Sequence, residues 1–370
     1  MENLYKKIPI LIAVLFFILI TAWFFMGNLF VNPHTSTGRL PVVDFSKDYP
    51  QKKMHLQDIA NLEYIPLETT KDVLFSEHAR LSYVSDNYIL VYEPLRGDIF
   101  IFHTTGKLFS HFNHKGGSGQ EYAWIGGAGV IFDEKNEEIF VCHNSIQVYS
   151  LNGKFKRTLR VNTIRHESKV SNFDDEAFLI YDDMLTEPDR NEGAEKPYRL
   201  LSKTDGSLIS VLNISLPKRY SSRIAQVEGK NWRPLLIYYL RNPHYGQDIM
   251  IADISSDTLY QLTQDKKLTP LLTRKPSVHA SEPRLVWTTF LTTDRFILIG
   301  AFLLDFNSKG GRIPTFMYEF DTGEISKPLI LDYDLRDWRI DSSPSTMDKN
   351  MTAELIQASS IIQAYKRQQL

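Results

Sequence analysis

From residue 56 onward, apolar and polar residues alternate in short runs, which is the period expected of half-buried β-strands. One unit recurs along this region: an alternating strand, a tight turn with Gly, Asp or Asn, and a second strand. Glycine, Asn-Gly and Asp-Gly accept the positive φ that short hairpin turns require. Five copies of the hairpin are visible, at 98–109, 145–155, 198–208, 258–268 and 315–325, and the fourth has no glycine.

Two further strands precede four of these five hairpins. The predicted pairs are 79–85 with 88–92, 129–132 with 139–142, 170–173 with 177–181, and 286–292 with 296–299. The turns recur roughly every 47 to 60 residues, which suits one four-stranded propeller blade per repeat. The sequence therefore predicts an all-β fold, a β-propeller of which five blades are visible as repeats. A two-sheet sandwich is the alternative, but it does not predict a repeat of this length.

The N-terminus carries a long apolar segment. No charged side chain occurs from Ile8 to Val31, and roughly 20 apolar residues are enough for a helix to cross the hydrocarbon core. Lys6 and Lys7 precede the segment, so the positive-inside tendency keeps the N-terminus in the cytoplasm and exports the rest. A cleavable signal peptide is the alternative, although no small-x-small site follows Ala22. The predicted organisation is a cytoplasmic tail at 1–7, a transmembrane anchor at 8–27, a tether at 28–55 and a propeller at 56–370.

Composition excludes some classes of protein. The chain has 42 Lys and Arg against 44 Asp and Glu, and a general nucleic-acid binder would show a basic excess, so we expect no nucleic-acid partner. The single cysteine, Cys142, rules out an intrachain disulfide and a cysteine-rich zinc site. It also rules out a lipoprotein, which needs a cysteine directly after the signal segment. Cys142 lies in an apolar run and is predicted to be a small buried core residue.

Two segments resemble those of a known family. Ile65–Thr69 (IPLET), and the glycine-rich Lys115–Tyr122 (KGGSGQEY) followed by a strand, are similar to segments of the bacterial cell-envelope six-bladed β-propellers with NHL-like repeats. The resemblance covers roughly 58–365 and implies six blades, but it carries no catalytic signature, and many members are lipoproteins of unknown function. This chain lacks the lipoprotein cysteine and ends in a helical pattern at 355–366. Ring closure then depends on N-terminal strands, around 62–66 or 42–45.

The connections between strands differ in length. First-to-second and third-to-fourth connections are short, whereas many second-to-third and blade-to-blade connections are long, and in a propeller these two long classes emerge on one face. Binding residues concentrate on long loops held by a rigid scaffold. The long connections are 182–197, 241–247, 303–314, 113–127, 215–234 and 273–284. The candidate ligand-binding residues of this face are Arg96, Trp124, His143, Asp182, Trp232, His244 and Tyr245.

Chemical signatures along the chain are weak. His111, His114 and His143 could bind a metal, and the pairs Asp174-Asp175 and Asp182-Asp183 could bind calcium, which prefers oxygen ligands. Gly116–Gly119 lacks the Lys-Ser/Thr of a nucleotide loop and is interpreted as a structural crossover. A basic and aromatic stretch spans Lys218, Arg219, Tyr220, Arg223, Lys230, Trp232 and Arg233.

Neither a Gly-x-Ser-x-Gly elbow nor a His-Glu-x-x-His motif occurs. We therefore predict no catalytic residue, no cofactor and no metal. The predicted function is a binding or scaffolding module for a protein, peptide or glycan partner. It would be held in the inner (cytoplasmic) membrane by a single span, with the propeller in the periplasm or outside the cell. The alternative is a propeller lyase or hydrolase, with or without calcium, whose site lies at the channel mouth.

Overall fold

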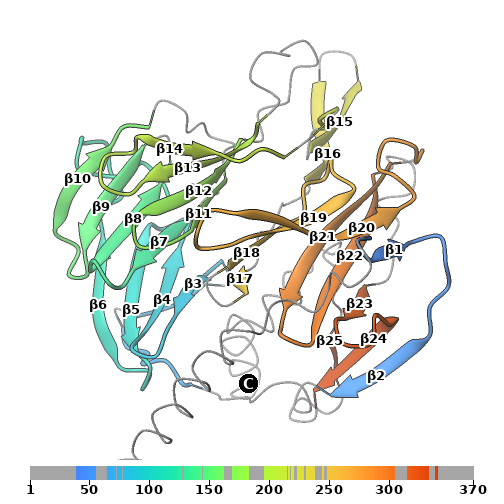
Figure 1. The fold of residues 1–370 in the computed structure, drawn as a ribbon. Helices are drawn as coiled ribbons and strands as arrows, with labels where there is room; N and C mark the ends of the chain where they lie inside the picture. Colours follow the sequence, from blue (N-terminus) through green and yellow to red (C-terminus); the bar gives the residue numbers. More distant parts are fainter. Residues whose placement is uncertain are drawn as a thin grey trace, which may run out of the picture. The chain divides into compact units, whose positions relative to one another are not determined.

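In the residues that it describes, the computed structural model consists of strands joined by turns (Figure 1). It describes residues 39–55, 65–71, 73–76, 78–126, 129–143, 145–161, 169–182, 196–214, 216, 218–220, 223–228, 231–237, 244–245, 248–282, 284–304, 315–332 and 338–340. Those from Val42 onward belong to one compact unit. In the described ranges, no helix is long and apolar enough to span a membrane. The predicted anchor at 8–27 and the predicted helix at 355–366 lie outside these residues.

Three antiparallel sheets follow one another in the first half of the chain, each with its four strands in sequence order. The first contains β3 (Arg80–Val84), β4 (Tyr88–Glu93), β5 (Asp98–His103) and β6 (Leu108–Asn113). The second contains β7 (Val130–Asp133), β8 (Glu138–Cys142), β9 (Ile146–Ser150) and β10 (Phe155–Leu159). The third contains β11 (Lys169–Asn172), β12 (Ala177–Tyr181), β13 (Tyr198–Ser202) and β14 (Leu208–Val211).

The second half adds two more sheets and a separate strand pair. The fourth sheet contains β17 (His244–Tyr245), β18 (Asp248–Ile251), β19 (Thr258–Leu262) and β20 (Leu268–Lys275). The fifth contains β21 (Arg284–Thr292), β22 (Phe296–Leu304), β23 (Phe316–Glu319) and β24 (Ile325–Asp332), with β25 (Trp338–Ile340) paired to β24. The separate pair is β15 (Arg223–Glu228) with β16 (Asn231–Ile237). The prediction of a loop over 215–234 is therefore wrong, because this basic stretch forms an antiparallel hairpin.

The N-terminal segment extends the last two sheets. β1 (Val42–Asp44) pairs in parallel with β20, and β2 (Gln51–His55) pairs in parallel with β24. These strands fall within 28–55, the range interpreted as a tether from its sequence. Val42–Asp44 is one of the two segments expected to close the ring; it forms a strand, but it pairs with the fourth sheet, so ring closure stays a prediction. The other, 62–66, lies mostly outside the described residues.

The hairpin turns have the backbone that the repeat predicts. Gly106, Gly153, Gly206 and Gly323 all have positive φ. Gly153 also cannot carry a side chain, because a Cβ there would lie 2.6 Å from the Phe112 ring. In the fourth repeat, which has no glycine, Lys266 takes this conformation with φ 64°.

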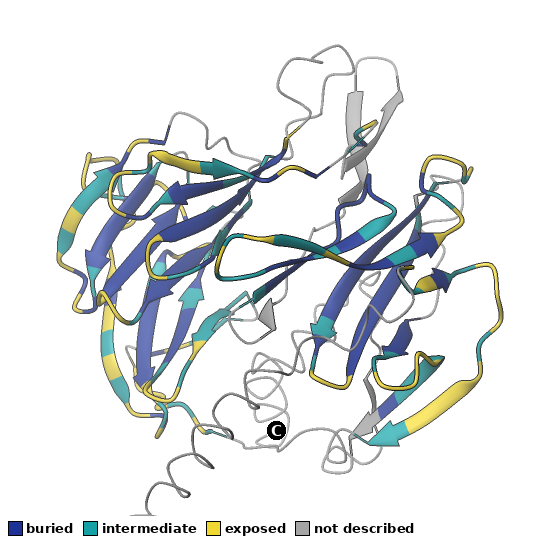
Figure 2. Ribbon diagram, viewed as in Figure 1, coloured by how far each residue is buried: buried dark blue, intermediate teal, exposed yellow. Residues whose placement is uncertain are grey.

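Successive sheets pack through apolar faces, and the buried residues lie along the strands (Figure 2). Ile101 of the first sheet belongs to the same buried cluster as Phe132 of the second. Phe140 of the second sheet meets Phe178 of the third edge to face, with ring centroids 4.9 Å apart. Met250 of the fourth sheet shares a cluster with Trp287 and other residues of the fifth. Sequential four-stranded sheets stacked in chain order are the arrangement of propeller blades, so the described chain is all-β and β-propeller-like.

Candidate functional site

The ends of the strands define two faces. In each four-stranded sheet, the second-to-third connection and the connection to the next sheet leave from one end, and the two remaining turns leave from the other. We call these the loop-rich face and the short-turn face. Like ends of adjacent sheets meet, since Asn87 in the β3–β4 turn donates to Glu134 in the β7–β8 turn on the short-turn face.

Trp124 and His143 form an aromatic pair on the loop-rich face. Trp124 belongs to the β6–β7 connection and His143 to the β8–β9 turn; their ring centroids lie 5.1 Å apart at 82°. Trp124 is 43% exposed although it is the largest kind of side chain. The structure thus brings together two residues that were predicted from loop position alone, and one of them presents indole surface to solvent.

Arg96 lies in the β4–β5 turn and makes polar contacts close to it. Its Nε lies 2.9 Å from Asp98 Oδ2, and its Nη2 donates to the carbonyl oxygen of Leu74 over 2.7 Å. Burial raises the pKa of the Asp98 carboxyl, but hydrogen bonds from Asn113 and His111 outweigh burial and hold that pKa below its usual value. Arg96 therefore lies in a local polar network of the first sheet.

Asp182 lies at the centre of a larger cluster. It follows β12 on the loop-rich face and pairs with Arg199 of β13, whose Nη2 lies 2.9 Å from Asp182 Oδ2. Arg219, from the connection after β14, donates to the backbone carbonyl of Asp182 over 2.6 Å. The guanidinium of Arg219 also lies 5.9 Å from the centre of the Tyr181 ring. Asp182 thus joins the β12–β13 connection to the segment that follows β14.

Asp253 completes this cluster from the fourth sheet, and it was not among the predicted residues. It follows β18, has no exposed surface, and its Oδ1 accepts a hydrogen bond of 2.7 Å from the backbone N–H of Ser255. Burial raises the pKa of this carboxyl, and the opposing effects of Ser255, Arg219 and Tyr198 do not cancel it. Burial, together with the nearby Asp253, raises the pKa of the Tyr198 hydroxyl well above its usual value.

Tyr220 joins the connections of two sheets at the same place. Its N–H donates to Ser255 Oγ over 2.8 Å, and its hydroxyl lies 3.1 Å from His279 Nδ1. Arg284, at the start of β21, places its guanidinium carbon 3.6 Å from the ring centroid of Tyr220. Sequence reasoning singled out Tyr220 as part of a basic and aromatic stretch, but not Arg284 or His279, which lies 59 residues further along the chain.

The remaining predicted residues are Trp232, His244 and Tyr245, for which the structure describes the backbone alone. Trp232 falls on β16, and His244 with Tyr245 forms β17. The backbone of all three is therefore in strands instead of loops. Their side chains lie outside the described residues.

The residues that the sequence offered as metal ligands do not form a metal site in the described part of the chain. His111 Nε2 lies 3.0 Å from Asp98 Oδ1, and His114 Nε2 lies 2.6 Å from the carbonyl oxygen of Gly153, so each of these two rings already has a protein partner. Asp174 and Asp182 lie at opposite ends of β12, a five-residue strand of about 17 Å, too far apart to share one ion. In the described ranges, no three His, Cys, Asp or Glu side chains lie close enough to hold a metal ion.

A family model described as a domain of unknown function, DUF4934, matches residues 40–275. The chain belongs to the DUF4934 family. No curated protein sequence matches it.

Three solved structures are similar to this DUF4934 chain at low identity. A Bacteroides fragilis protein described as exported superposes with a TM-score of 0.51 at 11% identity, covering 77% of this chain and 79% of that one. A DUF4221 family member from Bacteroides vulgatus gives 0.43 at 12% identity, with 71% and 83% covered. BamB from Moraxella catarrhalis gives 0.30 at 12%, with 65% and 81% covered. At 11% identity, the likeness to the Bacteroides fragilis protein shows the fold alone.

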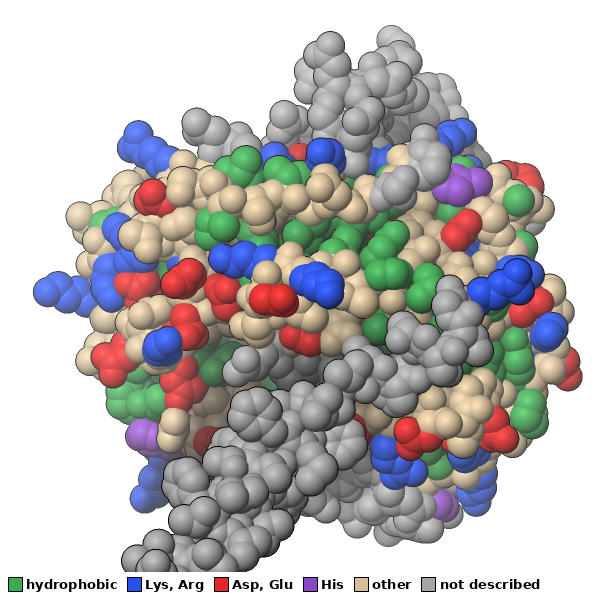
Figure 3. Space-filling model, viewed as in Figure 1, with side chains coloured by type: hydrophobic (Ala, Val, Ile, Leu, Met, Phe, Trp, Pro, Cys, Tyr) green, Lys and Arg blue, Asp and Glu red, His purple; other side chains and the backbone are tan. Residues whose placement is uncertain are grey.

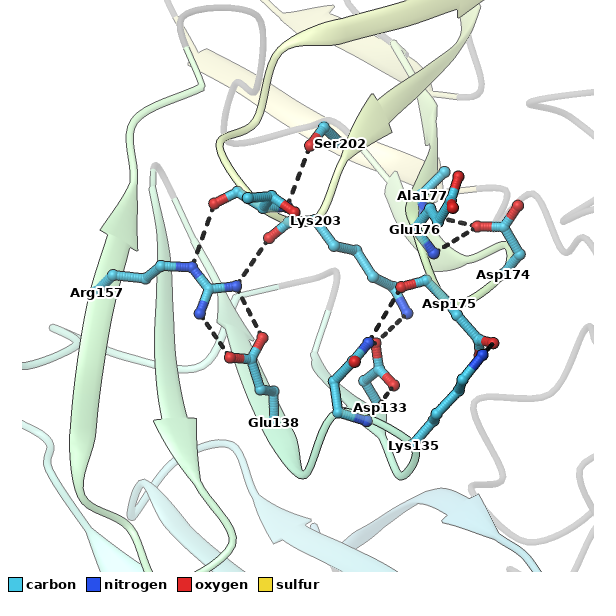
Figure 4. A network of polar contacts seen from close by, with 12 residues as sticks. Asp133, Lys135, Glu138, Arg157, Asp174, Asp175, Glu176, Ala177, Ser202 and Lys203 are labelled. Carbon is cyan, nitrogen blue, oxygen red and sulfur yellow. Dashed lines mark hydrogen bonds and ion pairs between the residues drawn. The ribbon is translucent and has the colours of Figure 1, made fainter.

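On the short-turn face of the DUF4934 chain, ion pairs join the second and third sheets (Figure 4). The guanidinium of Arg157 in β10 donates two hydrogen bonds, of 2.6 and 2.7 Å, to the carboxylate of Glu138 in β8. The same guanidinium donates to the backbone carbonyl of Lys203 in the β13–β14 turn over 3.0 Å. Lys203 in turn pairs with Asp133 of β7. These contacts fix the second sheet against the third, so their role is structural.

A shallow hollow of about 650 Å³ lies between the first and second sheets on this short-turn face. Its lining residues are Asp86, Asn87, Tyr88, His103, Thr104, Thr105, Glu134 and Glu137. Glu134 is committed to its neighbours, since it accepts hydrogen bonds from Tyr83 and Asn87. On the side shown in Figure 3, basic and acidic side chains are mixed, in keeping with the near-zero net charge.

Proposed function

We propose that this DUF4934 chain is a membrane-anchored, extracytoplasmic β-propeller of six blades that binds a protein, peptide or glycan partner through its loop-rich face. The anchor would be the apolar segment at 8–27, with residues 1–7 in the cytoplasm and the propeller in the periplasm or outside the cell. The five described sheets would be five of its six blades.

Export is supported by two independent observations. The uncharged run from Ile8 to Val31 follows Lys6 and Lys7, which favours translocation of everything beyond it. The exported protein of Bacteroides fragilis has a similar fold over 77% of this chain. That protein is described as exported, which agrees with the export that the charge pattern favours, although the similarity itself concerns only the fold.

The observation that carries the binding role is the Trp124–His143 pair. A tryptophan that is 43% exposed, fixed edge to face by a histidine from the next turn, offers a rigid aromatic anchor. Tryptophan is among the residues most enriched at binding hot spots, because it contributes a large contact area with few rotamers to fix. The cluster around Tyr220, on the same face, is basic and aromatic, which suits recognition better than metal-assisted chemistry.

The test combines topology with partner capture. A C-terminal alkaline phosphatase fusion, which is active only outside the cytoplasm, should be active in the full chain and inactive when residues 8–27 are deleted. Affinity capture from membranes with the full-length chain should then recover a partner whose yield falls for Trp124→Ala. Leu208→Ala is the matched control, because Leu208 is 57% exposed but follows a turn of the short-turn face. Equal recovery for both variants would reject the loop-rich face as the binding surface.

A further inference from the structure

The cluster around Tyr220 brings together groups from three segments that are far apart in sequence. Tyr220 is only 8% exposed and is held by Ser255 and His279. Since both ends of this residue are fixed, its ring is a rigid support for whatever lies over it. That position makes the surroundings of the ring a preformed part of the loop-rich face.

Two cations rest on this ring. The guanidinium carbon of Arg284 lies 3.6 Å from the ring centroid, and Lys218 Nζ lies 5.5 Å from it. In the part of the chain that the structure describes, neither Arg284 nor Lys218 pairs with a carboxylate. A ring attracts a cation without neutralising its charge, so both remain able to pair with an anion.

The nearby carboxylates are already committed. Asp182 pairs with Arg199 over 2.9 Å, and Asp253 has no exposed surface and accepts a hydrogen bond from the backbone N–H of Ser255. The contacts described around Tyr220 and Asp182 therefore involve four cationic side chains and two carboxylates. Both carboxylates are turned to their own partners, so the accessible part of the cluster, at Lys218 and Arg284, carries the positive excess.

We propose that Lys218 and Arg284, supported by Tyr220, form a binding site for carboxylate side chains of an acidic peptide segment. This rests on the proposed function and names the chemistry of the partner that the loop-rich face takes. The planar guanidinium of Arg284 matches a carboxylate with two parallel hydrogen bonds, and the flexible ammonium of Lys218 can follow a second carboxylate. A peptide is favoured over an acidic glycan because the Tyr220 ring, 8% exposed and covered by Arg284, offers no face for a sugar to stack on.

The test uses the full-length chain in detergent and a fluorescein-labelled hexaglutamate peptide, with binding measured by fluorescence anisotropy. Hexaglutamine serves as the uncharged peptide control. The dissociation constant should rise about tenfold for Arg284→Gln and severalfold for Lys218→Gln. Lys135→Gln, on the exposed short-turn face, should bind like the unaltered chain. Lys218 is exposed, so Lys218→Gln will fold even if Arg284→Gln does not.

The outcomes separate this inference from the proposed function. Equal affinity for hexaglutamate in all three variants would overturn it, as would binding of polygalacturonate or inorganic phosphate in place of the peptide. If the peptide fails to bind while capture of a partner still depends on Trp124, this inference fails and the proposed function stands. If neither the peptide binds nor capture depends on Trp124, both fail.

Discussion

Lys203 Nζ lies 2.8 Å from Asp133 Oδ2, and the two side chains are only 4% and 3% exposed. Lys203 belongs to the β13–β14 turn and Asp133 to the end of β7, so this buried ion pair joins two adjacent sheets. The ammonium also lies 5.9 and 5.8 Å from the ring centroids of Phe140 and Phe178, which form the apolar contact between the same sheets. Ionic and apolar contacts therefore meet at one point between the two sheets.

Removing one partner of this pair should strongly destabilise the protein. Asp133→Ala leaves the Lys203 ammonium buried without a counter-charge, which costs about 3–5 kcal/mol in the free energy of unfolding. Urea unfolding of the full chain measures the change. Lys135→Met is the matched control, because the Lys135–Asp175 pair joins the same two sheets but is 70% and 53% exposed. The control should leave the unfolding midpoint almost unchanged. Equal losses would contradict the account, whereas partial recovery in a Lys203→Met, Asp133→Leu double variant would support it.

Asp253 should make stability depend on pH. Its pKa is raised in the folded state because the carboxyl is buried, so the folded chain holds this proton more tightly than the unfolded chain. The stability that this contributes is complete below the unfolded pKa of about 3.8 and is lost as pH rises through the folded value. Asp253→Asn removes that dependence. The melting temperature of Asp253→Asn relative to the unaltered chain should therefore increase between pH 4 and pH 8, and a constant difference would show that the carboxyl is not perturbed.

Glu137 carries backbone strain that glycine would relieve. It has φ 50° in the β7–β8 turn, a conformation for which other turns of this chain use glycine. The left-handed conformation costs an L-residue roughly 1–2 kcal/mol. Glycine relieves this strain, but its greater freedom in the unfolded chain offsets part of the gain in stability. Glu137→Gly should therefore raise the free energy of unfolding by about 0.5–1 kcal/mol. Glu137→Ala removes the same carboxylate but keeps the strain, so a gain in that variant would contradict this explanation.

Cys142 should be chemically inert in the folded protein. It has no exposed surface, and burial raises the pKa of its thiol to about 12, so the reactive thiolate is scarce at neutral pH. A chromogenic disulfide reagent should detect no thiol in the native chain and one in denaturant. Rapid reaction in the native state would show that the second sheet opens easily. The interpretation of Cys142 as a core residue is confirmed by its burial.

The sheets could be predicted because their signals are local. Period-two alternation and a glycine at the turn lie within a dozen residues, and the φ of Gly106, Gly153, Gly206 and Gly323 confirms those turns. The hairpin β15–β16 was missed because its Lys, Arg and Trp residues suggested a solvated loop, although strands need only one apolar face. The six-bladed count and the NHL-like detail stay predictions.

The candidate site was predictable only in part. Trp124, His143 and Asp182 were singled out because they lie in connections of the loop-rich face, and their role in binding stays a prediction. Asp253 was missed because, in the sequence Asp-Ile-Ser-Ser-Asp, an aspartate looks like an ordinary turn residue. Its burial depends on how the third and fourth sheets pack, and that packing brings it to Tyr198 from 55 residues away. No local pattern encodes such a contact.

Site-specific photo-crosslinking tests the central claim, that the loop-rich face is the binding surface, most directly. A photoreactive amino acid would replace Trp124 or, in a second strain, Leu208, in the full-length chain expressed in its own cells. Both positions are exposed, at 43% and 57%, but they lie on opposite faces. The account predicts a discrete crosslinked product from position 124 and none from position 208. A product from position 208 alone, or equal products from both, would contradict it.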